Sequence, residues 1–235
     1  MLKAVIFDLD GVVADSHPIH EIAWRALLGE AGLDPRTIDV AFLYAGHPRR
    51  EILKHYLGEL SEEEIQHWGR RKDELYELES QNLKAKPGIP RVLSELQMGG
   101  IACALATSAG KKRTLESLRH LNLQSSFSVV VAGEDVKRAK PAPDIFLLAA
   151  QNLAVSSSDS VVVEDSVAGV QAAVAGGMKC VGFTSQEHCA ELYAGGAHDV
   201  ISNFPEESLR YFQTIASSKA PQKPTEYSLT SRQGR

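Results

Sequence analysis

Short apolar runs alternate with amphipathic stretches over most of the second half of the chain. The apolar runs of strand length cover residues 3–7, 101–107, 127–133, 159–165 and 178–184. Between the later runs, apolar residues recur at three- and four-residue spacing, which predicts helices at 88–98, 111–121, 143–153 and 166–175. Helices that alternate with continuously apolar strands are typical of a parallel sheet covered on both faces.

The segment 16–83 differs, because it carries helix signals and no convincing strand. We expect Ser16 to cap a first helix and Pro48 to open a second. Ser61, followed three residues later by Glu64, matches a capping box and predicts a third helix. This helical block interrupts the chain directly after the first strand, so we expect it to form an inserted cap.

The expected organisation follows from these two patterns. The fold class is α/β, with a parallel-sheet core formed by residues 1–15 and 84–216 and an α-helical cap domain formed by residues 16–83. Residues 217–235 are polar, contain proline and show no periodicity, so we expect a disordered tail there.

Composition narrows the classes of function. The chain has 235 residues, 43% of them apolar and 23% charged, which is ordinary for a globular protein with room for a core and a smaller domain. Its formal net charge of -5 provides no basic field for nucleic acid. No apolar stretch approaches the roughly 18 residues of a membrane helix, and the start is too acidic for a signal peptide. The three cysteines are widely spaced and suggest neither a disulfide framework nor a zinc motif, so we expect a cytoplasmic protein.

Polar residues follow four of the predicted strands, at the point where each strand ends or one loop later. They are Asp8 and Asp10 in FDLDGVVADS, Thr107 and Ser108 in LATS, Lys140 in AKPAPD, and Glu164 and Asp165 in VVVED. Ligands of open parallel sheets bind beyond the carboxyl ends of the strands. We therefore expect these side chains to meet at one edge.

Such a set has a chemical meaning. Clustered carboxylates repel one another unless a cation lies among them, and Mg²⁺ prefers oxygen ligands. A lysine and hydroxyl groups can hold phosphate oxygens, one carboxylate can attack phosphorus, and its neighbour can transfer the proton. Each piece alone has an ordinary alternative: a solvated turn, a helix cap or a surface lysine. The occurrence of all these residues together, in this order and at the strand ends, favours a functional site.

Four segments together resemble the haloacid dehalogenase (HAD) superfamily: FDLDGVVADS, LATS, AKPAPDIF and VVVEDSVAGVQAAVAGGM. The resemblance extends over about residues 1–205 and is closest to the branch with a small helical cap, which contains sugar-phosphate phosphatases and β-phosphoglucomutase. It implies a Rossmann-like core and Mg²⁺ as cofactor. The dehalogenases of the superfamily lack the second aspartate, so Asp10 argues against that chemistry.

The resemblance also implies roles for the core residues. Asp8 would be the nucleophile and Asp10 the general acid/base. The implied Mg²⁺ ligands are the side chains of Asp8 and Asp165 and the backbone carbonyl of Asp10, with Glu164 beside them. The implied phosphoryl-binding groups are Thr107, Lys140 and the backbone N–H of Ser108.

In the cap, His20, Gly46, Arg49 and Lys72 match substrate-contacting positions of the mutase. Ala45 stands where the mutase has a lysine, so one charge that grips phosphate is missing. Many phosphatases keep an equivalent histidine and arginine, and each cap residue could equally be half-buried or solvated without a role. The cap therefore leaves the choice between phosphatase and mutase open, and the missing lysine favours the phosphatase.

The resulting prediction is a monomeric, Mg²⁺-dependent phosphatase that acts on a small phosphorylated metabolite, a sugar or polyol phosphate, through an aspartyl-phosphate. The first alternative is an isomerase of the β-phosphoglucomutase type. The second is a catalytically idle protein that binds phosphosugars. Neither a nucleic acid nor a membrane is expected as a partner.

Overall fold

The computed structural model describes residues 1–44, 48–185 and 188–218. The chain divides into two compact units: Met1–Ala14 together with Ala85–Arg235, called the core unit below, and Asp15–Lys84, called the cap unit. Gly46 and the greater part of the predicted tail, from residue 219, lie outside the described residues.

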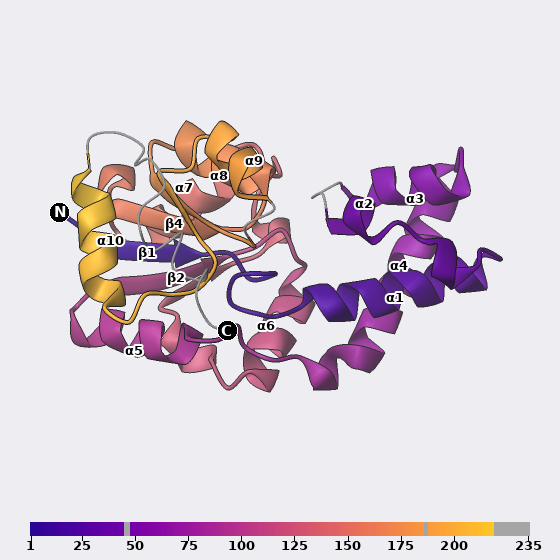
Figure 1. The fold of residues 1–235 in the computed structure, drawn as a ribbon, viewed down its shortest axis with the longest axis horizontal. Coiled ribbons are helices and arrows are strands. Elements are labelled where there is room, and N and C mark those ends of the chain that lie inside the picture. Colours follow the sequence, from indigo (N-terminus) through magenta and orange to yellow (C-terminus); the bar gives the residue numbers. More distant parts are fainter. Residues whose placement is uncertain (45–47, 186–187, 219–235) are drawn as a thin grey trace, which may run out of the picture. The chain divides into compact units, whose positions relative to one another are not determined.

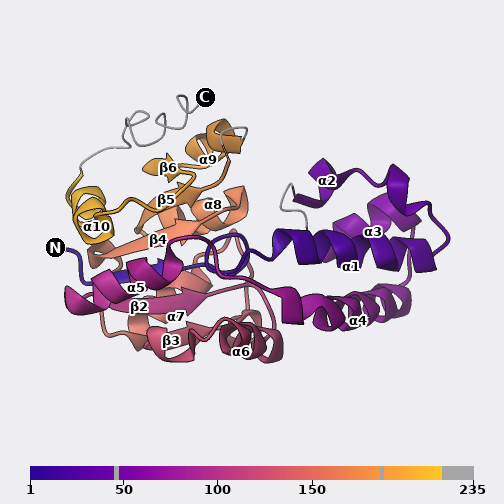
Figure 2. The same cartoon turned by 60° about the horizontal axis from the view of Figure 1, so that its bottom comes forward.

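The core unit contains a parallel sheet of six strands in the order β3-β2-β1-β4-β5-β6. The strands are β1 (Ala4–Phe7), β2 (Ala102–Ala106), β3 (Val129–Val131), β4 (Ser160–Glu164), β5 (Lys179–Phe183) and β6 (Asp199–Ile201). Figure 2 shows them in this order, from β6 at the top to β3 at the bottom. The predicted α/β class with a Rossmann-like parallel sheet is confirmed.

Helices cover both faces of this sheet (Figure 1). The core helices are α5 (Ile89–Met98), α6 (Lys111–His120), α7 (Asp144–Asn152), α8 (Val167–Ala175), α9 (Cys189–Ala194) and α10 (Ser208–Ser217), with short 3-10 helices at Gln124–Ser126, Gly133–Asp135 and Ser157–Asp159. Because side chains alternate along a strand, Ile6 packs in one core cluster with Phe146 of α7 and Val170 of α8, whereas Phe7 contacts the ring of Phe212 on α10.

The register of the central strands brings their carboxyl ends to the same level. Phe7, the last residue of β1, pairs with Leu105 of β2 and with Val163 of β4. The N–H of Asp8 donates to the carbonyl of Val163 (3.0 Å). Asp8, directly after β1, and Glu164, the last residue of β4, are therefore neighbours at the carboxyl ends of these two strands.

The cap unit is helical, as the sequence indicated. Its helices are α1 (His17–Glu30), α2 (Val40–Tyr44), α3 (Arg49–Leu57) and α4 (Glu62–Glu79), with 3-10 helices at Pro35–Thr37 and Ser80–Asn82. Helix α1 packs along α4 and buries Trp24 and Leu27. Ser61 and Glu64 form the predicted capping box. Ser16 occupies the predicted N-cap position of α1, but its backbone is already helical, and its buried hydroxyl makes no capping bond and finds no hydrogen-bond partner in the part of the chain that the structure describes.

Several core elements differ from the prediction. Strand β3 has three residues instead of the expected 127–133, because it is an edge strand and only this stretch pairs with β2. Strand β6 and helices α9 and α10 were not predicted, and Ser217, the first residue of the expected tail, is helical. Within the described residues, no helix combines the length and apolar character needed to cross a bilayer.

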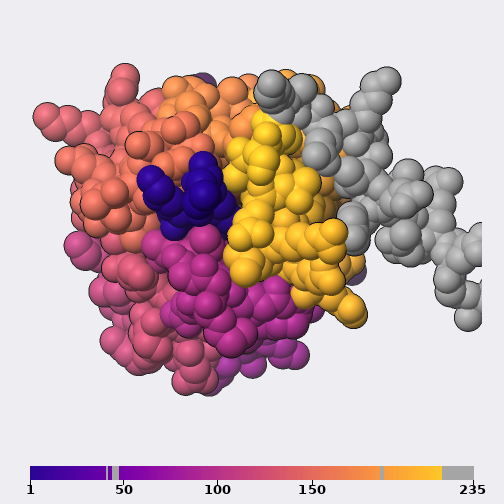
Figure 3. Space-filling model, turned by 90° about the vertical axis from the view of Figure 1, so that its left-hand side faces the viewer, coloured from indigo at the N-terminus to yellow at the C-terminus, as the bar shows by residue number. Residues whose placement is uncertain are grey.

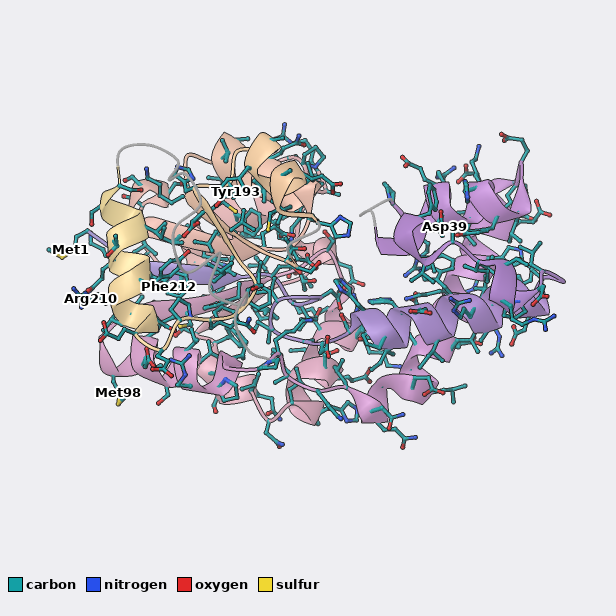
Figure 4. The ribbon with its side chains drawn as sticks, viewed as in Figure 1. Met1, Asp39, Met98, Tyr193, Arg210 and Phe212 are labelled. Atoms are coloured by element: carbon teal, nitrogen blue, oxygen red, sulfur yellow. The ribbon has the colours of Figure 1, made fainter. Side chains whose placement is uncertain are left out.

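The first residues of the chain lie at the amino ends of the strands. Figure 3 shows the first residues, in indigo, beside α10, in yellow. The terminal amino group of Met1 pairs with Asp159 at 3.0 Å. Figure 4 shows Phe212 directed from α10 toward the strands, where it is fully buried, while Arg210 points outward. Chemistry is therefore expected at the opposite edge of the sheet.

Candidate active site

Asp8, Lys140 and Glu164 meet at the carboxyl edge of the sheet. The Lys140 Nζ donates to Asp8 Oδ1 at 2.6 Å and to Glu164 Oε2 at 2.7 Å. The three side chains are almost completely buried, with 7% of Asp8 and Lys140 and 2% of Glu164 exposed. The lysine lies in the loop after β3 and passes over the ring of Phe146, 4.8 Å from its centroid. Two strand ends and one loop thus place a buried ammonium ion between two buried carboxylates.

The start of α8 fixes the orientation of Glu164. Its Oε1 accepts hydrogen bonds from the backbone N–H (3.0 Å) and the hydroxyl (2.7 Å) of Ser166. The same hydroxyl caps α8 by accepting from the N–H of Gly169. A Cβ atom at Gly169 would lie 2.0 Å from the carboxyl carbon of Glu164, so only glycine leaves room for the carboxylate here. The Ser166 hydroxyl therefore caps α8 and positions the Glu164 carboxylate at the same time.

Asp165 adds a third carboxylate to this site. Asp8, Glu164 and Asp165 each offer an oxygen, and the three oxygens lie within 4.8 Å of one another. Burial raises the pKa of Asp8 well above its usual range; Lys140 opposes this effect, and the charges of Glu164, Asp165 and Asp10 add to it. Burial alone would lower the pKa of Lys140, but Asp8 and Glu164 outweigh it and raise that pKa, which keeps the ammonium form.

The charge balance of this group fits a divalent cation. The oxygens of Asp8, Glu164 and Asp165 lie within 4.8 Å of one another, and carboxylates this close repel one another unless a cation joins them. All the donors are hard oxygens, the type that Mg²⁺ prefers. The residues that could hold such an ion are thus Asp8, Glu164 and Asp165.

Thr107 and Ser108 follow β2 at the same edge. The N–H of Thr107 donates to the carbonyl of Val131, and its buried hydroxyl accepts from the N–H of Ala109 (3.1 Å). Ser108 is exposed. The alternative that these residues merely cap the next helix does not hold, because the N-cap of α6 is Gly110. Their local structure is a turn at the carboxyl end of β2.

Asp10 has a partner that the sequence did not suggest. Its two carboxylate oxygens accept from the two terminal nitrogens of Arg113, at 2.9 and 2.6 Å. Gly11 follows with a φ of 74°, and its N–H donates to the carbonyl of Ala14 in a tight turn. The side chain of Asp10 therefore has a defined orientation, and it is not one of the three carboxylates whose oxygens lie within 4.8 Å of one another.

The described cap residues lie in two places within the cap unit. Lys72 is 4% exposed, contacts the Nδ1 of His20 and lies 4.9 Å above the ring centroid of Tyr76. Arg49, in contrast, forms a double contact with the carboxylate of Asp73 (3.0 and 2.6 Å) and donates to a backbone carbonyl. The buried Lys72 and the half-buried His20 thus form a pair, whereas Arg49 belongs to an ion pair that is about half exposed.

Sequence reasoning missed Ser166, Gly169 and Arg113 as parts of this arrangement. Ser166 carried a signal, since a serine before an apolar run predicts a helix cap, but its second bond to Glu164 required the fold. The residues around Arg113 in the sequence carried no signal of its contact with Asp10. A surface hollow of about 460 Å³ lies elsewhere in the core unit, against α5 and α10, and none of the predicted site residues lines it.

Known proteins resemble this chain in sequence and in fold. Residues 5–183 match the model of the family described as haloacid dehalogenase-like hydrolase. A phosphorylated carbohydrates phosphatase of Thermotoga maritima is 37% identical over 76% of this chain and 83% of its own length, and hexitol phosphatase A of Escherichia coli is 35% identical over 74% and 80%. The crystal structure of β-phosphoglucomutase from Clostridium difficile superposes with a TM-score of 0.77, at 28% identity, over 92% of this chain and 97% of that one.

Proposed function

Because the chain belongs to the haloacid dehalogenase-like hydrolase family, we propose that it hydrolyses sugar or polyol phosphates in a Mg²⁺-dependent reaction through a phosphorylated Asp8. The broader class, a phosphoric monoester hydrolase, is confirmed by that membership and by the relatives named as phosphatases. The observation that carries the finer proposal is the buried contact of Lys140 with Asp8 and Glu164, beside Asp165.

In the first step, the Asp8 carboxylate attacks phosphorus, and the bond from phosphorus to the sugar oxygen breaks. Lys140, already at hydrogen-bond distance from Asp8, offsets negative charge on the transferring group. Asp10 gives a proton to the departing sugar oxygen. Thr107 and the Ser108 N–H bind phosphoryl oxygens in this proposal. Bound Mg²⁺ would offset further negative charge and polarise the phosphoryl group.

In the second step, water attacks the phosphorus of the aspartyl-phosphate. Asp10 takes the proton from this water, the bond between Asp8 and phosphorus breaks, and inorganic phosphate is released. The Asp8 carboxylate and the protonated Asp10 are thereby restored. One residue must act as an acid in the first step and as a base in the second. This requirement supports a second aspartate, Asp10, beside the nucleophile Asp8.

The substrate class is proposed from two sources. The relatives named above act, by their names, on phosphorylated carbohydrates and on hexitol phosphates. In the cap unit, the half-buried His20 and the buried Lys72 provide polar groups among aromatic rings, which suits hydroxyl-rich ligands. We propose His20, Lys72, Arg49 and Gly46 as substrate contacts and a monomeric, cytoplasmic enzyme.

The second candidate is a mutase that returns the phosphoryl group to another sugar hydroxyl. The structural match to β-phosphoglucomutase favours it. Ala45, which stands where the mutase has a lysine, disfavours it. The ion pair between Arg49 and Asp73 further reduces the positive charge available to a second phosphate.

A panel of sugar and polyol phosphates, assayed with Mg²⁺ and with EDTA, tests the proposal. We expect metal-dependent release of inorganic phosphate, and a loss of at least ~100-fold in kcat for Lys140→Ala. Lys137→Ala, an exposed lysine in the same loop, is the matched control and should retain activity. Conversion of β-glucose 1-phosphate to glucose 6-phosphate with little free phosphate would support the mutase instead. Binding without either reaction would show an idle protein.

A further inference from the structure

The contact between Arg113 and Asp10 joins two segments that are 103 residues apart in sequence. Arg113 is the third residue of α6, and Asp10 lies just after β1. The guanidinium donates one hydrogen bond to each carboxylate oxygen, and only 23% of the arginine and 25% of the aspartate side chain is exposed. A two-point contact of this kind fixes the orientation of a carboxylate as well as its position.

Neighbouring cations on α6 are far more exposed than Arg113. Lys111 approaches Asp135 at 3.4 Å with 59% of its side chain exposed, and Lys112 approaches Glu116 at 3.9 Å with 71% exposed. Arg113 therefore differs from the solvated charges around it.

The first turn of α6 is firmly held, so Arg113 has a stable base. The buried Thr114 donates its hydroxyl hydrogen to the carbonyl of Gly110 at 2.9 Å. The N–H of Lys111 donates to Glu134 Oε2 at 3.1 Å. Leu118, one turn further along, is fully buried in the core unit. A side chain on this turn can therefore act as a fixed support.

The chemistry of the two side chains indicates what the contact between Arg113 and Asp10 can do. Arginine has no acceptor and does not lose its proton, so Arg113 cannot itself exchange a proton with a substrate. Its two hydrogen bonds use one lone pair on each oxygen of Asp10. Because a carboxylate oxygen has two lone pairs, this contact alone does not prevent Asp10 from taking a proton from water or, when protonated, from giving it to the departing sugar oxygen. The contact can thus hold Asp10 without blocking proton transfer.

We propose that Arg113 is a positioning residue for Asp10, which acts on the reaction through that carboxylate and does not bind the substrate. The inference rests on the proposed function, because it assumes that Asp10 is the general acid/base. It assigns a role to a residue that neither the four sequence motifs nor the substrate-binding pattern of the cap includes.

The test is a double-mutant cycle with Arg113→Ala, Asp10→Asn and the combined variant, assayed with the best sugar phosphate from the panel and Mg²⁺. For Arg113→Ala we expect a loss of at least ~10-fold in kcat, as for a general acid/base held in a wrong orientation, with KM changed by less than ~3-fold. Arg113→Lys should recover part of kcat, because one ammonium group can still reach the carboxylate. Lys112→Ala is the matched control and should leave kcat unchanged.

In the Asp10→Asn background, Arg113→Ala should cause no further loss, because the residue through which Arg113 acts has already been disabled. An equal loss in both backgrounds would overturn the proposal and indicate direct action on the substrate, as would a rise in KM alone. Wild-type kcat for both Arg113 variants would overturn it as well. If Arg113→Ala does not fold, Arg113→Lys with and without Asp10→Asn provides the same comparison.

The outcome for Asp10→Asn alone separates this inference from the proposed function. If that single variant retains wild-type kcat, the proposed acid/base role is wrong, and the positioning role is overturned with it. If it loses activity while Arg113→Ala does not, the proposed function stands and only the role of Arg113 is rejected.

Discussion

At the scale of single residues, the site consists of acidic groups in a buried place and the groups that make this tolerable. Lys140 contacts both Asp8 and Glu164, and Ser166 holds the far oxygen of Glu164. The carboxylates of Asp8, Glu164 and Asp165 lie close enough together to repel one another. The residual repulsion is what would give a divalent cation its affinity.

Asp8→Asn tests the nucleophile. We expect a loss of more than ~1,000-fold in phosphate release, because an amide cannot attack phosphorus. Burial raises the pKa of Asp8 in the folded state above its value in the unfolded state. Between these two pKa values the folded chain keeps a proton that the unfolded chain has lost, so the free energy of unfolding falls as the pH rises. Removing the charge should therefore leave the metal-free Tm at pH 8 equal to or above that of the wild type. A clear fall in Tm would assign Asp8 a structural role.

Gly169→Ala tests the space under the start of α8. The added Cβ would meet the Glu164 carboxyl carbon at 2.0 Å, so the carboxylate must move. Although alanine favours a helix by about 1 kcal/mol, we expect at least a ~10-fold loss in kcat. Gly176→Ala, where a Cβ would have ordinary contacts at 3.4 Å, is the matched control. Equal activity of the two variants would show that the Glu164 position is not critical.

At the scale of elements, the prediction succeeded where one local pattern decided the structure. The runs before Asp8 and Glu164 are continuously apolar and became central strands, buried on both faces. Strand β6 begins with the charged Asp199 and has three residues, too few to show a period. Helix α10 is amphipathic, with Phe212 and Ile215 buried, but its polar surroundings hid that pattern.

The site residues likewise divide into those that a local pattern indicated and those that it did not. Residues at strand ends could be proposed from topology alone, because the carboxyl ends of parallel strands meet at one edge. Contacts between distant segments could not: nothing in the sequence near Arg113 indicates Asp10. Likewise, the pairing of Arg49 with Asp73 depends on how α3 and α4 pack.

Asp199 links β6 to α9 and α10, three elements that the sequence did not predict, and Tyr211→Phe tests the importance of this link. This fully buried carboxylate accepts from Tyr193 (3.0 Å) on α9 and from Tyr211 (2.9 Å) on α10. Removing the Tyr211 hydroxyl should lower the free energy of unfolding by about 1–3 kcal/mol, because a buried acceptor loses a donor. Urea denaturation measures this. Tyr56→Phe removes an exposed hydrogen bond in the cap unit and should cost less; an equal or smaller cost for Tyr211→Phe would contradict the account.

At the scale of the whole molecule, the sheet brings together acids that lie more than 150 residues apart, and metal binding should therefore stabilise the folded chain. At a Mg²⁺ concentration of 100 times Kd, linkage predicts about 2.7 kcal/mol of added stability, seen as a rise in Tm. The rise should disappear in Asp165→Asn and persist in Asp144→Asn, an acid that pairs with Arg138 outside the site. An undiminished rise in Asp165→Asn would place the metal elsewhere.

The central claim is that Asp8 carries the phosphoryl group during turnover, and rapid quenching tests it most directly. The Asp10→Asn variant, whose second step should be slow, is mixed with a sugar phosphate and Mg²⁺, quenched in acid and digested for mass spectrometry. The account predicts a phosphoryl group on the peptide that contains Asp8, formed with Mg²⁺ and absent with EDTA. Turnover of this variant with that peptide unmodified, or with the phosphoryl group on another residue, would contradict it.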